Sequence, residues 1–192
     1  MIPRRLEGKD FMRIVAEETM ALVIDYQERL VPVMYHTEEL IRNSSILLQG
    51  LKALEIPMVV SQQYTKGLGM TVPSIREAVG EHFTYLDKLT FSCAEDMQLL
   101  GRLQEIGRKN IILCGMEAHI CVLQTAIDLI AKGFTVILVE DCISSRREAD
   151  KAVAVRRAES EGAILTTYEA ILFELTRVAK TDVFRTISGL TK

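Results

Sequence analysis

Short apolar runs alternate along the chain with longer segments whose apolar residues recur at helical spacing. The runs predict six strands, at residues 20–25, 58–61, 83–86, 110–115, 134–139 and 163–166. The spacing predicts helices over 40–54, 99–106, 119–132 and 152–158, a loop at 64–69 and a partly helical tail from 168. Strands that are apolar throughout suit a parallel sheet buried on both faces. The alternation therefore predicts an α/β protein, with a three-layer α/β/α Rossmann-like fold around a central six-stranded parallel sheet and right-handed crossovers.

The size and charge of the chain limit its class. The 192 residues favour one domain over 1–192, with peripheral ends of about 15 residues at the N-terminus and about 17 at the C-terminus. A net charge of −3 with scattered basic residues argues against a nucleic-acid partner. No stretch without Asp, Glu, Lys or Arg exceeds ten residues, so we expect no membrane partner. We expect a cytoplasmic protein, although Arg4 and Arg5 are weakly compatible with organelle import.

The segment 114–121 reads CGMEAHIC and gathers two cysteines, a histidine and a glutamate at the end of a predicted strand. A metal site, a disulfide, a piece of core and a catalytic nucleophile are all compatible with such a cluster. The four cysteines are expected to be reduced in a cytosol-like chain. Cys114 and Cys142 lie beside apolar runs, where a cysteine usually serves as a small core residue.

Three reactive residues are predicted at the carboxyl edge of the sheet, where ligands of open α/β sheets bind. Asp25 ends the first strand, Lys88 follows the third, and Cys121 opens the helix after the fourth. A helix N-terminus and a nearby ammonium lower the pKa of a thiol and enrich the thiolate. A carboxylate beside the thiol can act as general acid and base.

Each of these residues also has an ordinary structural role to weigh. An aspartate at a strand end is more often a cap or turn residue, a single lysine is usually solvated, and a single cysteine is usually core. Periodicity alone therefore leaves the catalytic and the structural interpretation open.

Three separated motifs, in order, resemble the isochorismatase-like cysteine hydrolases. They are Leu22–Gln27 (LVIDYQ), Asp87–Ser92 (DKLTFS) and Gly115–Val122 (GMEAHICV), and the resemblance runs from about residue 21 to residue 175. Further stretches resemble the branch of small isochorismatase-domain-containing proteins, whose substrates are unsettled: Gln62–Gly69 (QQYTKGLG), Leu123–Ala126 (LQTA) and Ile143–Arg146 (ISSR).

The resemblance implies a role for each matched residue. Cys121 would be the nucleophile, Asp25 the general acid and base, and Lys88 the charge that stabilises the thiolate. The family's loop has a cis peptide at the position of Met116 and Glu117. The backbone N–H groups of Glu117 and Cys121 would then hold an oxyanion, and a thioester would form on Cys121 and be hydrolysed.

Two departures from other family members narrow the predicted reaction. Nicotinamidases bind a metal through an aspartate and histidines after the second strand, whereas this chain has Ser61–Tyr64 (SQQY) there, and His36, His82 and His119 are dispersed. We therefore predict no metal and no cofactor. True isochorismatases lack the nucleophilic cysteine, so Cys121 indicates a small amide, carbamoyl or related acyl substrate.

Five residues are assigned to substrate binding. They are Gln27, Gln63, Tyr64, Glu117 and His119. The carboxylate of Glu117 either lines the pocket and rejects anionic substrates or serves the helix dipole. His119, surrounded by apolar residues, has an alternative role as a packing contact.

Other functions compete with hydrolysis. A catalytically weak oligomeric scaffold of the same fold is the principal alternative, since homo-oligomers are common in the family. Thiol redox sensing would need a second cysteine near Cys121, and Cys114 is seven residues away across a strand end. Nuclease activity is disfavoured, because the sequence has no basic stripe that could bind a nucleic acid.

Overall fold

A six-stranded parallel sheet forms the centre of the protein in the computed structural model, which describes residues 13–81 and 83–192. The strands are β1 (Thr19–Ile24), β2 (Met58–Gln63), β3 (Leu86–Lys88), β4 (Asn110–Met116), β5 (Thr135–Ser144) and β6 (Ile164–Thr166). Their order in the sheet is β3-β2-β1-β4-β5-β6. The predicted parallel sheet is confirmed, while Arg4, Arg5 and His82 lie outside the described residues.

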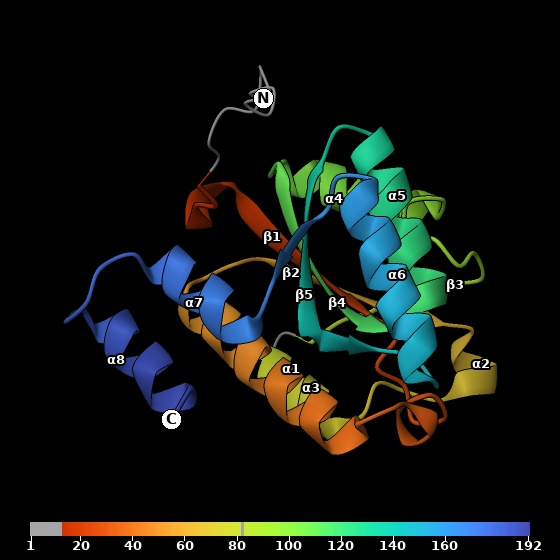
Figure 1. Cartoon of the computed structure of the whole chain (residues 1–192), viewed down its shortest axis with the longest axis horizontal. Helices are drawn as coiled ribbons and strands as arrows, with labels where there is room; N and C mark the ends of the chain where they lie inside the picture. The colour runs from red at the N-terminus through yellow and green to blue at the C-terminus, as the bar shows by residue number, and fades with distance from the viewer. Residues whose placement is uncertain (1–12, 82) are drawn as a thin grey trace, which may run out of the picture.

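Helices cover both faces of this sheet (Figure 1). One layer contains α1 (Thr37–Ala53), α3 (Pro73–Val79), α7 (Tyr168–Thr176) and α8 (Asp182–Leu190). The other contains α4 (Met97–Ile106), α5 (Leu123–Ala131) and α6 (Glu148–Ser160). Shorter turns are η1 (Ala16–Glu18), η2 (Val31–Val33), α2 (Thr65–Leu68) and the π-helix η3 (Ala118–Val122). The three-layer prediction is thereby confirmed.

The alternation of side chains along β1 explains why Met20–Ile24 is an unbroken apolar run. Ala21 and Val23 belong to the hydrophobic cluster under α1, and Leu22 and Ile24 belong to the cluster under α4 and α5. Successive side chains of a strand point to opposite faces, so a strand covered on both faces has no position for a solvated residue. Apart from Thr19 at its first position, this strand therefore contains only apolar residues, and the charged side chain of Asp25 comes directly after its end.

Helix ends follow local chemistry where the sequence provides it. The carboxylate of Asp96 accepts from the backbone N–H groups of Gln98 and Leu99 and so caps α4. The helix ends at Gly107, which has a left-handed φ of 72°. The predicted end of this helix near Gly107 is confirmed.

Pairing partners shift two strands from their predicted positions. β3 forms at Leu86–Lys88, where it pairs with Ser61–Gln63, and not at 83–86. β5 continues to Ser144 beyond its predicted end at residue 139, because a register shift opposite Leu113 and Gly115 lets it pair again with Met116. Both shifts depend on a neighbouring strand that the local pattern does not reveal.

Two further differences concern helices. The segment after the 64–69 loop, for which no helix was predicted, contains α3. This helix begins at Pro73 and buries Ile75 and Ala78. The C-terminal tail, expected to be peripheral, contributes Ile187 of α8 to the core without any exposed surface.

Candidate active site

The strand order reverses between β1 and β4, which is the position where open α/β sheets bind ligands. Asp25 follows β1 directly and adopts a left-handed φ of 55°. Cys121 lies in η3 after β4, and Lys88 is the last residue of β3. The structure thus brings the three residues to one edge of the sheet. Two small differences from the predicted positions remain, since Asp25 lies just beyond its strand and Lys88 within one.

Close packing at this edge requires Gly115. Its φ is 133°, and a Cβ atom there would lie 2.1 Å from the carbonyl oxygen of Ile24. Only glycine tolerates both the conformation and the approach. Gly115 therefore allows the end of β4 to lie directly against the end of β1. Beyond this point the chain continues to Asp25 after β1 and to the turn that contains Cys121 after β4.

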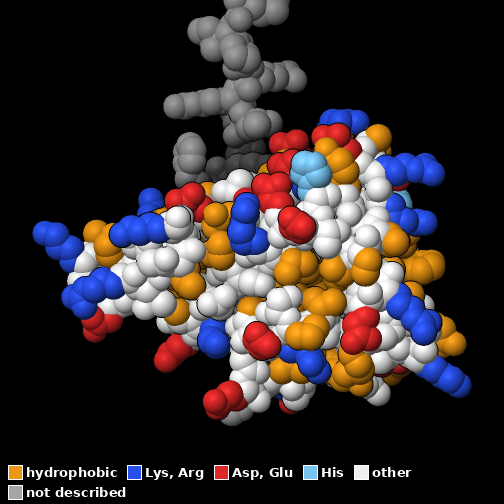
Figure 2. All heavy atoms as spheres, turned by 90° about the horizontal axis from the view of Figure 1, so that it is seen from below, with side chains coloured by type: hydrophobic (Ala, Val, Ile, Leu, Met, Phe, Trp, Pro, Cys, Tyr) orange, Lys and Arg blue, Asp and Glu red, His pale blue; other side chains and the backbone are white. Residues whose placement is uncertain are grey.

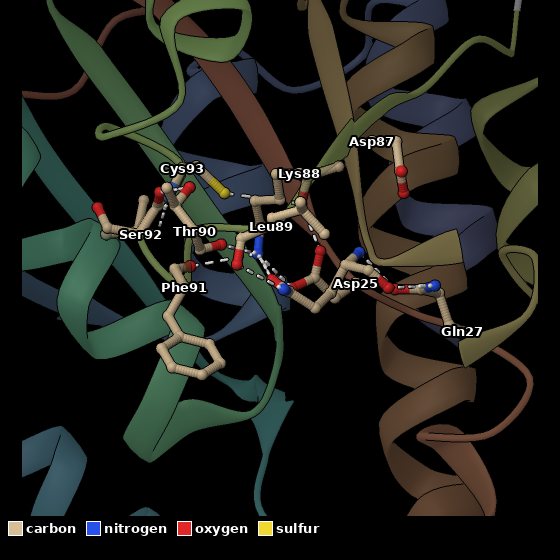
Figure 3. Close-up of polar contacts among 12 residues, drawn as sticks. Asp25, Gln27, Asp87, Lys88, Leu89, Thr90, Phe91, Ser92 and Cys93 are labelled. Atoms are coloured by element: carbon tan, nitrogen blue, oxygen red, sulfur yellow. Dashed lines mark hydrogen bonds and ion pairs between the residues drawn. The ribbon is translucent and has the colours of Figure 1, made fainter. Parts of the chain in front are cut away.

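Lys88 is enclosed by four acceptors (Figure 3). Its Nζ lies 2.9 Å from Asp25 Oδ2, 2.6 Å from Gln63 Oε1, and 3.3 and 3.2 Å from the carbonyl oxygens of Thr90 and Phe91. Burial alone would lower the pKa of Lys88, but the charge of Asp25, with smaller contributions from Cys93 and Cys121, outweighs it and raises the pKa. The ammonium is therefore retained although neither its side chain nor that of Asp25 is exposed.

The second oxygen of the Asp25 carboxylate has its own donor. Ser61 Oγ donates to Asp25 Oδ1 at 2.7 Å, and the thiol of Cys93 donates to Ser61 Oγ at 3.6 Å. The backbone N–H of Cys93 donates to Thr125 Oγ1 at 2.9 Å. Asp25 is thus held between β2 and β3, with no freedom to rotate without losing a hydrogen bond.

The environment of Cys121 differs from the expectation of a stabilised thiolate. Burial, followed by the charge of Asp25, raises the pKa of the Cys121 thiol to about 12, and Lys88 only partly opposes this shift. Desolvation is the largest cause of this shift, and the ammonium of Lys88, which is paired with Asp25, offsets only part of it. Cys121, only 6% exposed, rests as a thiol beside a carboxylate.

The loop before Cys121 has the geometry that the resemblance implied. The peptide bond between Met116 and Glu117 is cis. The carbonyl oxygen of Glu117 accepts from the N–H groups of Ile120 and Val122. Among the hydrogen bonds of residues 13–81 and 83–192, none has the backbone N–H of Glu117 as donor. This N–H group is therefore available to a ligand.

The side chain of Glu117 does not present a free negative charge. Its Oε1 lies 2.7 Å from Nε of Arg146, and the Glu117 side chain is 11% exposed against 58% for Arg146. Arg146 therefore offsets the charge by which Glu117 was expected to reject anionic substrates.

The other predicted binding residues lie in different environments. Gln27 is fully buried, and its amide bonds the backbone N–H and carbonyl of Gln63 and the carbonyl of Gly69. Gln27 therefore holds the backbone of Gln63, whose side-chain oxygen accepts from Lys88. Tyr64 is 49% exposed, and its backbone N–H donates to the Lys88 carbonyl.

His119 has a partner that sequence reasoning did not identify. Its Nδ1 lies 2.9 Å from the hydroxyl oxygen of Ser145, at the end of β5. The carbonyl of Ser145 in turn accepts from the backbone N–H of Tyr35. His119 therefore connects the turn that contains Cys121 to Ser145 after β5 and, through Ser145, to Tyr35 in the segment after β1.

Several contributors to the site were missed in the sequence. Ser61 ends a predicted strand at the ligand-binding edge, and this position was a usable signal. Cys93 and Thr125 carried no such signal, because they reach Asp25 only through Ser61 in the tertiary structure. Arg146 lies in the Ile143–Arg146 stretch that carries part of the resemblance, but its contact with Glu117 is visible only in the structure.

Within residues 13–81 and 83–192, the cysteines and histidines form no other recognisable centre. All four cysteines lie in the described part of the chain and are unpaired. Between residues 13 and 192, position 82 aside, no three His, Cys, Asp or Glu side chains are grouped as metal ligands. Among the helices of the described residues, none has the length and apolar character to cross a membrane.

A parallel sheet of order 3-2-1-4-5-6, with Asp25, Lys88 and Cys121 at its carboxyl edge, defines an α/β protein whose candidate site contains a carboxylate, an ammonium and a thiol. The chain belongs to the isochorismatase family, whose domain model matches residues 19–170. It is 34% identical over 180 residues to isochorismatase domain-containing protein 2 of Danio rerio, covering 93% of this chain and 89% of that protein. Membership indicates hydrolase activity without fixing the bond or the substrate.

Solved structures agree with this assignment. The MAR1 ribonuclease of Caenorhabditis elegans is 36% identical, with a TM-score of 0.87 over 93% of this chain and 92% of that one. An octameric hydrolase of unknown specificity from Escherichia coli shares the fold at a TM-score of 0.89 and 21% identity, over 95% of this chain and 92% of that one.

Proposed function

We propose that the protein is a metal-independent cysteine hydrolase that acts on a small amide, carbamoyl or related acyl substrate. The observation that carries this proposal is the buried carboxylate of Asp25, fixed by Lys88 and Ser61 at the site of the Cys121 thiol. A carboxylate beside a protonated thiol can accept the thiol proton while the sulfur attacks a bound substrate.

In the first half-reaction, Sγ of Cys121 attacks the carbonyl carbon while its proton passes to Asp25. The carbonyl oxygen becomes an oxyanion, held by the backbone N–H groups of Glu117 and Cys121. The free N–H of Glu117 supports this assignment. The bond to nitrogen then breaks, Asp25 gives its proton to the leaving amine, and an acyl thioester remains on Cys121.

In the second half-reaction, water attacks the thioester carbonyl and gives a proton to Asp25. The carbon–sulfur bond breaks, the acid is released, and the proton returns from Asp25 to the thiolate of Cys121. Lys88 changes no bonds in this cycle. Its charge keeps Asp25 ionised between proton transfers and limits the cost of the transient thiolate.

Substrate contacts are proposed for Gln63, Tyr64, Glu117 and His119, with Gln27 acting through Gln63. The low exposure of Asp25, Lys88 and Cys121 supports a small acyl group at the reacting centre. The exposed ring of Tyr64 is suited to the leaving-group side. We expect no cofactor.

The direct test is intact mass spectrometry after incubation with a panel of small amides and carbamoyl compounds. We expect an acyl adduct that maps to Cys121, and turnover that survives chelators. Cys121→Ala should abolish both the adduct and turnover, and Cys142→Ala, a buried cysteine in the opposite core layer, should retain them. Full turnover by Cys121→Ala would refute the proposal.

An oligomeric scaffold remains the second candidate, supported by the octameric state of the Escherichia coli hydrolase. We expect this chain to form a homo-oligomer, which light scattering would measure. A scaffold without catalysis would form that oligomer but give no adduct on Cys121 with any compound of the panel.

Ribonuclease activity is a further alternative, raised by the similarity to the Caenorhabditis elegans MAR1 ribonuclease. The face shown in Figure 2 has acidic and basic side chains interspersed, which does not favour RNA binding. We expect no cleavage of single-stranded RNA at equal enzyme concentration. RNA cleavage that Cys121→Ala abolishes would replace the amide proposal with this one.

A further inference from the structure

Two buried side chains, Cys93 and Ser61, form a hydrogen-bonded chain to Oδ1 of Asp25, whereas Lys88 contacts Oδ2. Cys93 donates to Ser61, and Ser61 donates to Asp25 Oδ1. Neither Ser61 nor Cys93 has exposed surface. A hydroxyl can donate one hydrogen while accepting another, and its hydrogen turns to suit its neighbours. A thiol that donates to Ser61 therefore leaves the serine hydrogen for Asp25.

Cys93 is suited to this role because it stays protonated and fixed. Burial, and then the charge of Asp25, raises the pKa of its thiol to about 11. The backbone N–H of Cys93 is tied to Thr125 in α5. The direction of the chain is thus set from Cys93 to Ser61 to Asp25 at neutral pH.

We infer that Ser61 and Cys93 are positioning residues that hold Asp25 as a carboxylate beside Cys121. The inference rests on the proposed role of Asp25 as the base for that thiol. Titratable and charged groups face Asp25 from three places: Lys88 from β3, Cys93 from the segment before α4, and Cys121 from η3. Lys88 and Ser61 each occupy one carboxylate oxygen. Loss of Ser61 would leave one oxygen without its donor and make protonation of Asp25 easier.

The test needs no knowledge of the substrate. Iodoacetamide alkylates Cys121 by forming a carbon–sulfur bond and expelling iodide, while the thiol proton passes to Asp25. The rate of this reaction, followed by mass spectrometry of the Cys121 peptide, should therefore fall at acid pH as Asp25 becomes protonated. The pH at which it falls reports how well the carboxylate is stabilised.

Ser61→Ala should move this acid limb upward by roughly one pH unit, the effect of one hydrogen bond to a charged group. Cys93→Ala should move it in the same direction by less, and Cys93→Ser, which keeps a donor, should restore it. Cys142→Ala, another cysteine without exposed surface, should leave it unchanged. This pattern separates positioning from a general loss of packing, which would lower rates without moving the limb.

An unmoved acid limb in a folded Ser61→Ala protein would overturn the inference, as would equal limbs in Cys93→Ala and Cys93→Ser. If Ser61→Ala does not fold, the Cys93 pair decides. Failure of the proposed function would show itself separately, because no amide would then leave an acyl adduct on Cys121 even if the acid limb moved as expected.

Discussion

The ammonium of Lys88 lies 2.9 Å from Oδ2 of Asp25, and neither side chain is exposed to solvent. Such a pair is costly to desolvate and is retained only where geometry and further hydrogen bonds compensate. Here three more acceptors surround Lys88 and a second donor reaches Asp25. The pair is therefore a fixed unit of the site and a poor source of net stability.

Breaking this pair from one side should be more damaging than removing it. Lys88→Met leaves a buried, uncompensated carboxylate and should lower the free energy of unfolding by roughly 3–5 kcal/mol. The double variant Lys88→Met with Asp25→Asn should lose less than the sum of the two single variants, as urea unfolding would show. Strict additivity would contradict the coupling. All three variants should lack activity.

Gly115 should be the least replaceable glycine of the site. Gly115→Ala places a Cβ atom 2.1 Å from the Ile24 carbonyl oxygen and forces an unfavourable φ, so we expect a protein that is strongly destabilised or does not fold. Gly101→Ala, within α4 and with no atom within 4 Å of the added Cβ, is the matched control. It should raise stability by about 0.5–1 kcal/mol in thermal or urea unfolding. Equal effects would show that the close approach is absent in solution.

Stability should decrease above pH 9 because of the buried thiols. Burial raises the pKa of Cys114 from 9.0 to about 12 and that of Cys93 from 9.0 to about 11. Between these values the unfolded chain loses protons that the folded chain keeps, so the free energy of unfolding falls by about 1.4 kcal/mol per pH unit for each such cysteine.

Urea unfolding under reducing conditions, at several values between about pH 8 and pH 10, measures this slope, to which every buried thiol with a raised pKa contributes. Cys114→Ala should have a shallower slope than the natural protein, whatever its absolute stability. A slope that this variant leaves unchanged would show that Cys114 is exposed or ionised in the folded state.

Arg146 should set the charge preference of the nucleophile. Arg146→Met leaves the carboxylate of Glu117 uncompensated, which should disfavour anionic reagents at Cys121. The ratio of alkylation rates with iodoacetate and iodoacetamide should fall by at least about threefold. Arg102→Met, which removes an arginine from an exposed ion pair with Glu105 on α4, is the control and should leave the ratio unchanged. A constant ratio in Arg146→Met would place Glu117 outside the path to the sulfur.

The layers of the fold and the edge where the site lies can be predicted from residue order and type. Apart from Thr19 and Asn110 at their first positions, strands β1 and β4 contain only apolar residues and one glycine because both faces are covered, and that pattern is local enough to read directly. The positions of Asp25 and Cys121 follow from it, since the carboxyl ends of parallel strands share one edge.

The electrostatics of the site, in contrast, depend on contacts that form only in the folded chain. Burial and the charge of Asp25 raise the pKa of the Cys121 thiol, and the carboxylate of Glu117 is ion-paired because Arg146 reaches it from beyond β5. The position of β3 and the hydrogen-bond chain from Cys93 likewise depend on partners distant in sequence. Residue type and spacing specify which groups reach an edge of the sheet. Charge and protonation depend on distances of a few ångströms that only the packed chain defines.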